Sequence, residues 1–355
     1  MSIDLTGITN KNEYYTNHYF STIFEENAGE AITAWAQAAK SSEEIRTPWA
    51  QLRQNARQFY PLHDRYAGGA LNLQLLAAIR TMADRYLASL GYPEAAPELV
   101  PVDASLSVPV YLEMKKSNGA PLLWVMLSAS RESDAGILES NVFDGNIAEE
   151  DAFGAVHSDD LLELKNEDLA TQILFGSAEP PRFLLFISLN QIALIDRNKW
   201  SEKRYLQFEL EDLFSRLELT TLQAMVVLLH KDSLCPEDGS ILLDELNEQS
   251  QKNAAGVSQD LKYALRECIE LLGNEVLRDM RTRQKINLEE HPVDAGQLTL
   301  ECLRYMYRML FVLFIEARPE LGYAPIRELS YLKGYSLESL RDIASSAASA
   351  SFGIT

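Results

Sequence analysis

The sequence is poor in the residues that bind metal ions and form disulfides. Its 355 residues include three cysteines and five histidines. The cysteines, Cys235, Cys268 and Cys302, lie far apart, with no CxxC motif and no histidine at zinc-ligand spacing. Zinc sites and disulfide frameworks need closely spaced ligands or paired cysteines. We therefore expect neither, and we expect the free thiols of a protein in a reducing cytoplasm.

Long apolar runs are also missing. The longest, residues 309–315, is bounded by Arg308 and Glu316, whereas a membrane-spanning helix needs about 20 apolar residues. The first twenty residues lack the basic start and the apolar centre of a secretory signal. The sequence therefore predicts a cytoplasmic protein that makes no membrane contact.

Basic residues are scarce in one part of the chain. The net charge is −20, from 32 lysines and arginines against 52 aspartates and glutamates. Residues 101–260 hold 12 basic against 28 acidic residues, and residues 261–355 hold 12 against 13. Because sequence-independent DNA affinity comes from lysine and arginine displacing counterions, we expect any DNA contact either in the C-terminal part or through a basic domain that this sequence does not contain. The acidity of the middle part is expected to keep the protein soluble.

The hydrophobic pattern changes along the chain. Residues 13–40 and 71–90 have helical apolar periodicity. Two β-rich runs around Asn118-Gly119 predict a hairpin, and further β-rich runs meet near Asn190 and at 204–210. After residue 220 the pattern is again helical. We expect an α+β fold, a mixed β-sheet with flanking helices and a degenerate nuclease-like core, followed by an α-helical domain.

The same patterns predict four parts. They are an N-terminal helical segment at 1–70, an α+β domain at 71–215 with a long acidic loop at 131–168, a helical domain at 216–343, and a low-complexity tail at 344–355.

Several segments resemble, in the same order, the N-terminal half of large bacterial adenine-specific DNA methyltransferases. They include NEYYTNHYFSTIF at 12–24, GAPLLWVML at 119–127, FLLFISLNQIALIDRNKWSEKRYLQFELEDLF at 183–214 and the stretch 303–343 around RPELGYAP. Such methyltransferases belong to type IIG-like restriction-modification, BREX and DISARM phage-defence systems. The resemblance implies that this region precedes a Rossmann-like domain, which binds S-adenosylmethionine and methylates adenine N6.

The motifs of that catalytic domain are missing from this sequence. A flipped adenine is held by an Asn-Pro-Pro-Tyr-type motif, whereas the only Pro-Pro here lies between Glu179 and Arg182. We therefore expect no methylation and no bound cofactor from this chain alone. The resemblance implies a scaffold, DNA-positioning or partner-docking region, which would reach DNA through the complete protein and contact other defence-system subunits.

One local pattern points to different chemistry. Asp103, Glu113 and Lys115 have the D-x9-E-x-K spacing of PD-(D/E)xK nucleases, in which two carboxylates hold Mg²⁺ and a lysine helps to activate water. In those nucleases the E-x-K strand leads into a helix, whereas here a second apolar strand, 122–127, follows after a tight turn. The alternative is a solvated pattern on an edge strand. A third hypothesis is a free-standing acidic interaction protein or DNA mimic.

The most basic local group lies at the end of a predicted helix that starts at Ser258. It comprises Arg278, Arg281, Arg283 and Lys285, and Arg304 and Arg308 extend it on the next helix. Arginines at a helix C-terminus are favourable on electrostatic grounds alone. The functional alternative is contact with DNA phosphates or with an acidic partner surface.

Overall fold

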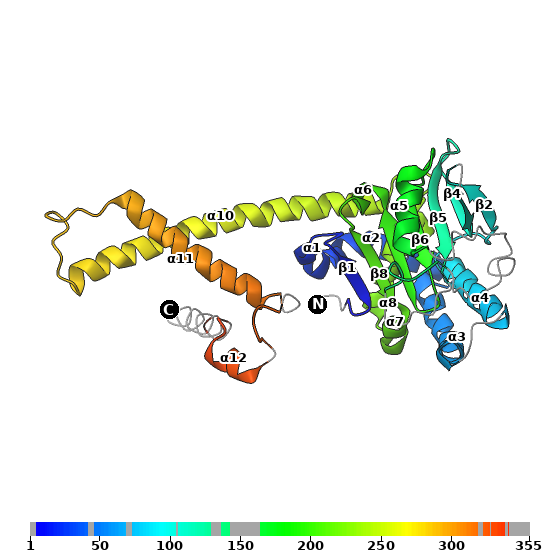
Figure 1. The fold of residues 1–355 in the computed structure, drawn as a ribbon, viewed down its shortest axis with the longest axis horizontal. Helices are drawn as coiled ribbons and strands as arrows, with labels where there is room; N and C mark the ends of the chain where they lie inside the picture. Colours follow the sequence, from blue (N-terminus) through cyan, green and yellow to red (C-terminus); the bar gives the residue numbers. More distant parts are fainter. Residues whose placement is uncertain are drawn as a thin grey trace. The chain divides into compact units, whose positions relative to one another are not determined.

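The computed structural model divides into two units, which we call unit 1 (Met1–Ala254) and unit 2 (Ala255–Thr355). A mixed sheet with flanking helices is followed by a helical region, which confirms the predicted fold class (Figure 1). The predicted tail at 344–355 and most of the predicted acidic loop lie outside the described residues. The structure describes residues 5–41, 46–68, 73–103, 106–128, 136–142, 164–318, 322–326, 328–337 and 340.

The main sheet of unit 1 has six strands. Their order is β1 (Ile8–Lys11), β8 (Tyr205–Glu209), β7 (Gln191–Asp196), β6 (Phe183–Ile187), β5 (Pro121–Leu127) and β4 (Leu112–Lys115). Neighbouring strands are antiparallel except β5 and β6, which are parallel. A parallel pair needs a crossover, and α5 (Asn166–Gly176) lies in this connection. All five residues of β6 are buried, as expected for a strand covered on both faces.

The predicted hairpin around Asn118-Gly119 is the β4–β5 pair. Gly119 has a φ of +85°, a conformation that glycine adopts without strain. Two structural features were not predicted. One is a separate two-stranded sheet of β2 (Glu98–Pro101) and β3 (Ser107–Val110). The other is β1, which lies in the segment for which the sequence predicts only helix.

Besides α5, further helices complete unit 1. They are α1 (Asn17–Thr22), α2 (Phe24–Ser41), α3 (Pro48–Gly68), α4 (Leu73–Ser89), α6 (Arg197–Trp200), α7 (Leu210–Arg216), α8 (Leu219–Leu229) and α9 (Lys231–Leu234). Eight of the eleven residues of α8 are buried, and α8 contacts α2 and α3. A helix that is apolar all round belongs in the core. The core of unit 1 therefore includes a central helix as well as the sheet.

Unit 2 consists of helices. The 41-residue helix α10 (Leu242–Thr282) begins in unit 1, where Leu243, Leu246 and Ser250 are buried, and continues into unit 2. It is followed by α11 (Ala295–Glu316) and α12 (Leu329–Gly334). Asp294 caps α11, because its Oδ1 accepts hydrogen bonds from the backbone of Gly296 and Gln297. No helix among the described residues is long and apolar enough to cross a membrane.

Candidate functional sites

The nuclease-like residues Glu113 and Lys115 lie side by side on β4. Glu113 Oε2 lies 2.9 Å from Lys115 Nζ, and this hydrogen bond raises the pKa of the Lys115 ammonium. Glu113 Oε1 accepts a hydrogen bond of 3.0 Å from Trp124 Nε1 on β5. Both carboxylate oxygens of Glu113 therefore already have partners within the sheet.

Asp103 lies elsewhere, in the connection between β2 and β3. Its Oδ1 accepts a hydrogen bond of 2.9 Å from the backbone of Leu106. A surface pocket of about 340 Å³ is lined by Glu113 and Lys115 together with Glu98 and Glu179, and Asp103 is not part of its lining. No group of three or more potential metal-binding side chains occurs within the described parts of the chain.

The order of elements also bears on the nuclease hypothesis. β5, not β4, precedes helix α5 and the parallel strand β6. β5 therefore holds the position of the E-x-K strand in the nuclease pattern. Its sequence is PLLWVML, and every residue from Leu122 to Leu127 is buried. A strand of this composition offers no carboxylate to a metal ion.

The six basic residues predicted to contact DNA or a partner all lie exposed in unit 2. Three of them form ion pairs with acidic residues three or four positions earlier: Arg278 with Glu275 at 3.5 Å, Arg283 with Asp279 at 3.6 Å, and Arg304 with Glu301 at 2.8 Å. Arg281, Lys285 and Arg308 have no ion pair among the described residues. Neighbouring carboxylates thus partly neutralise the charge of three of these six basic residues.

Helix α11 carries an exposed apolar stripe, which sequence analysis did not predict to be exposed. We define the α11 stripe as five residues at spacings of three and four, which place them on one helix face: Leu300, Leu303, Tyr307, Phe311 and Phe314. They are 40–70% exposed, and Cys302 is the one buried residue of α11. A helix in a folded domain normally buries such a stripe. The hydrophobic periodicity was visible in the sequence, but its exposure was not.

The stretch around RPELGYAP leads to a side-chain contact at the end of α11. Glu316 accepts hydrogen bonds from Tyr331 Oη at 2.9 Å, from Ser336 Oγ at 3.1 Å, and from the backbone of Leu337. The bond to Glu316 raises the pKa of the Tyr331 phenol. One carboxylate thus holds α12 and the residues after it against the end of α11.

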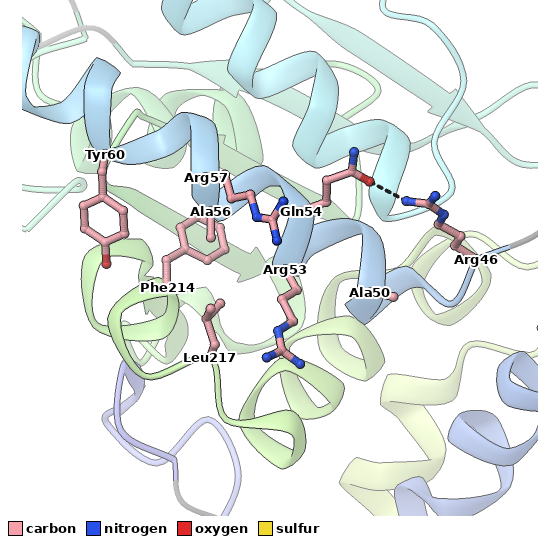
Figure 2. A pocket seen from close by; sticks show the side chains of 9 residues that line it. All are labelled: Arg46, Ala50, Arg53, Gln54, Ala56, Arg57, Tyr60, Phe214 and Leu217. Atoms are coloured by element: carbon pink, nitrogen blue, oxygen red, sulfur yellow. Dashed lines mark hydrogen bonds between the residues drawn. The ribbon is translucent and has the colours of Figure 1, made fainter.

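Three arginines line a pocket in unit 1 that sequence analysis missed. Arg46, Arg53 and Arg57 surround a hollow of about 540 Å³, with Phe214 and Leu217 also in its lining (Figure 2). A signal existed in the sequence, since residues 46–65 contain four arginines and one acidic residue. In a chain with a net charge of −20, this local excess of positive charge is unusual.

Buried charges form a further group near the start of the chain. Lys199 Nζ donates a hydrogen bond of 2.5 Å to the backbone oxygen of Tyr14 and lies over the rings of Tyr14 and Tyr15. Burial lowers the pKa of the Lys199 ammonium to about 8. Close by in sequence, Asp196 accepts a hydrogen bond from Arg182, which also pairs with Asp244 on α10. These contacts join α6 to the segment between β1 and α1, and they join the end of β7 to α10 through Arg182, so their role is structural.

Comparisons of the chain with protein-family models, with curated proteins and with solved structures find no match.

Proposed function

We propose that this chain is a non-catalytic docking region of an adenine-specific DNA methyltransferase of bacterial phage defence or restriction-modification. In this proposal unit 1 is the folded scaffold, and unit 2 binds the domain that carries the methyltransferase chemistry. The ordered sequence resemblance supports the family. The α11 stripe is the observation that carries the docking role.

The size of the exposed apolar surface favours a protein partner. Buried aromatic side chains contribute about 150–250 Å² each, and the three rings of the α11 stripe are 53–70% exposed. Covering them removes roughly 350 Å² from water, which is close to half of the ~800 Å² that each partner contributes to a standard interface. The two leucines of the stripe add to that area. The largest contiguous apolar surface of a monomeric protein is typically about 300–600 Å² and is often a functional site.

The charged residues beside the stripe suit the same role. Arg304 and Arg308 lie on α11 next to the stripe, one turn apart and both exposed. Interfaces combine an apolar centre with a polar rim, and arginine is enriched in them. The partner surface is therefore expected to have an apolar groove with acidic residues along one edge.

The same arginines give unit 2 a secondary part in DNA positioning. Residues 255–355 contain 12 basic and 14 acidic residues, whereas residues 1–254 contain 20 and 38. Unit 1 therefore repels a phosphate backbone much more strongly than unit 2 does. In the assembled protein, DNA is expected to pass beside unit 2 rather than unit 1.

A binding measurement tests the docking role. The full chain is titrated by calorimetry with a separately purified catalytic domain of an adenine-specific DNA methyltransferase from the same defence system. Phe311→Glu is expected to weaken binding at least tenfold, because a carboxylate cannot be buried in an apolar groove. The matched control is Phe175→Glu on α5, a phenylalanine that is 59% exposed in unit 1 and is expected to leave binding unchanged. Absence of binding, or equal loss in both variants, would overturn the proposal.

A further inference from the structure

The arginine pocket of unit 1 lies between α3 and the end of α7. Its lining includes Arg46, Arg53, Arg57 and Tyr60 from the α3 region, and Phe214 and Leu217 from α7 and its C-cap (Figure 2). Its volume of about 540 Å³ falls within the range of pockets that hold small ligands. None of the lining residues that the structure describes is acidic.

The local sequence explains why the arginines are brought together. Pro48 is the first residue of α3, a position that proline favours. Arg53 and Arg57 are four residues apart, so their side chains leave the same face of the helix. Arg46 precedes the helix, and its Nη1 donates a hydrogen bond of 2.8 Å to Gln54 Oε1. Gln51 holds the backbone of Arg46 by a hydrogen bond of 3.1 Å.

Among the residues that the structure describes, no carboxylate forms an ion pair with these arginines. Arg53 and Arg57 have no ion pair among the described residues, and the side-chain hydrogen bond of Arg46 goes to an uncharged amide. Other arginines of unit 1, such as Arg182 and Arg204, do pair with carboxylates. Like charges at i,i+4 destabilise a helix, so the positions of Arg53 and Arg57 carry an energetic cost that a bound anion would relieve.

Apart from Gln54, the rest of the described lining is apolar or aromatic. Phe214 is buried against Phe59 of α3, with ring centroids 5.3 Å apart. Tyr60 is half-buried, and its hydroxyl donates to the backbone oxygen of Glu211 at 3.4 Å. Leu217 has a left-handed φ of +51°, a conformation that costs energy for a side chain other than glycine. A rigid apolar wall thus stands beside the three guanidinium groups.

We propose that this pocket binds a small phosphorylated ligand of the nucleotide class. The guanidinium groups of Arg46, Arg53 and Arg57 would bind the phosphates, since arginine forms paired hydrogen bonds with phosphate oxygens. The planar base would pack beside Tyr60 and Leu217. A compact ligand suits the site better than a nucleic-acid strand, because the acidic surface of unit 1 repels an extended phosphate backbone and a small molecule need not cross it.

The site is tested by calorimetric titration and thermal unfolding of the full chain with ADP, pyrophosphate, adenosine and a 12-nucleotide single strand. ADP is expected to bind and to raise the unfolding temperature of unit 1. Pyrophosphate is expected to bind more weakly than ADP, and adenosine at least tenfold more weakly. ADP affinity is also expected to fall as salt is raised.

Two variants with equal charge change decide where the ligand binds. Arg53→Gln with Arg57→Gln is expected to reduce ADP affinity at least tenfold. The matched control, Arg281→Gln with Arg308→Gln, removes two exposed arginines of unit 2 and is expected to leave ADP affinity unchanged. The proposal is overturned if ADP does not bind, if both variants lose affinity equally, or if the oligonucleotide binds and ADP does not.

Discussion

Replacing Gly91 by alanine is expected to destabilise unit 1 strongly. Gly91 follows α4 with a φ of +78°, and a left-handed backbone costs a residue with a Cβ about 1–2 kcal/mol. In addition, a Cβ at this position would lie 2.8 Å from both Cε1 and Nε2 of His230. The imidazole ring must therefore move.

The surroundings of His230 set the size of that second effect. The ring is buried, lies 4.6 Å from the ring of Trp35, and accepts a hydrogen bond of 3.1 Å at Nδ1 from the backbone of Asp232. Overpacking a core position costs about 1–3 kcal/mol, and losing the hydrogen bond about 1 kcal/mol. Gly91→Ala should therefore lower the free energy of unfolding by about 3–6 kcal/mol.

The matched control is Gly119→Ala in the β4–β5 turn. Gly119 has a similar φ of +85°, but a Cβ there would meet nothing within 4 Å, so only the backbone cost of about 1–2 kcal/mol applies. Urea unfolding is followed by tryptophan fluorescence, because all four tryptophans lie in unit 1. Equal losses in Gly91→Ala and Gly119→Ala would refute the steric argument.

Three further predictions concern titration and metal chemistry. Burial lowers the pKa of the His230 imidazole, so on acidification the unfolded chain takes up this proton at a higher pH than the folded chain. The stability of unit 1 should therefore fall as the pH drops below about 6.5. His230→Asn should reduce this pH dependence, measured by urea unfolding at several pH values. The folded pKa of Lys199 is about 8, so this residue should contribute about 1–2 kcal/mol of added stability between pH 8 and 10, and Lys199→Met should lose that contribution relative to the wild-type chain. Supercoiled plasmid should stay uncut with Mg²⁺ or Mn²⁺, because Glu113 is already engaged; metal-dependent cutting lost in Glu113→Ala would contradict this.

Local signals in the sequence were sufficient for much of the sheet. The Asn118-Gly119 turn between two apolar runs correctly predicts the β4–β5 hairpin. The apolar runs on either side of Asn190 correspond to β6 and β7. In each case strand and turn are neighbours in sequence, so the pattern contains the information needed to pair them.

Features that depend on distant residues could not be predicted. β1 has only four residues, and its partner is β8, about 200 positions later, so no local periodicity reveals the strand. The sequence also does not predict that α10 continues without a break through residues 250–258, because that part of the helix is largely exposed and lacks an apolar stripe. The sequence contains an excess of arginine at 46–65, but only the tertiary structure shows that Arg53 and Arg57 line a pocket whose described residues include no carboxylate.

The pairing of β1 with β8 has a consequence for the synthesis of the protein. Ile8 is opposite Phe208, so at a translation rate of about 5–20 residues per second β1 leaves the ribosome roughly 10–40 s before its partner exists. Throughout that interval its backbone donors and acceptors are open to other strands, the condition under which edges aggregate. The polar Asn10 and Lys11 make β1 a poor template for such pairing. β8, the last strand of this six-stranded sheet to be synthesised, therefore completes the sheet by pairing with β1, the first.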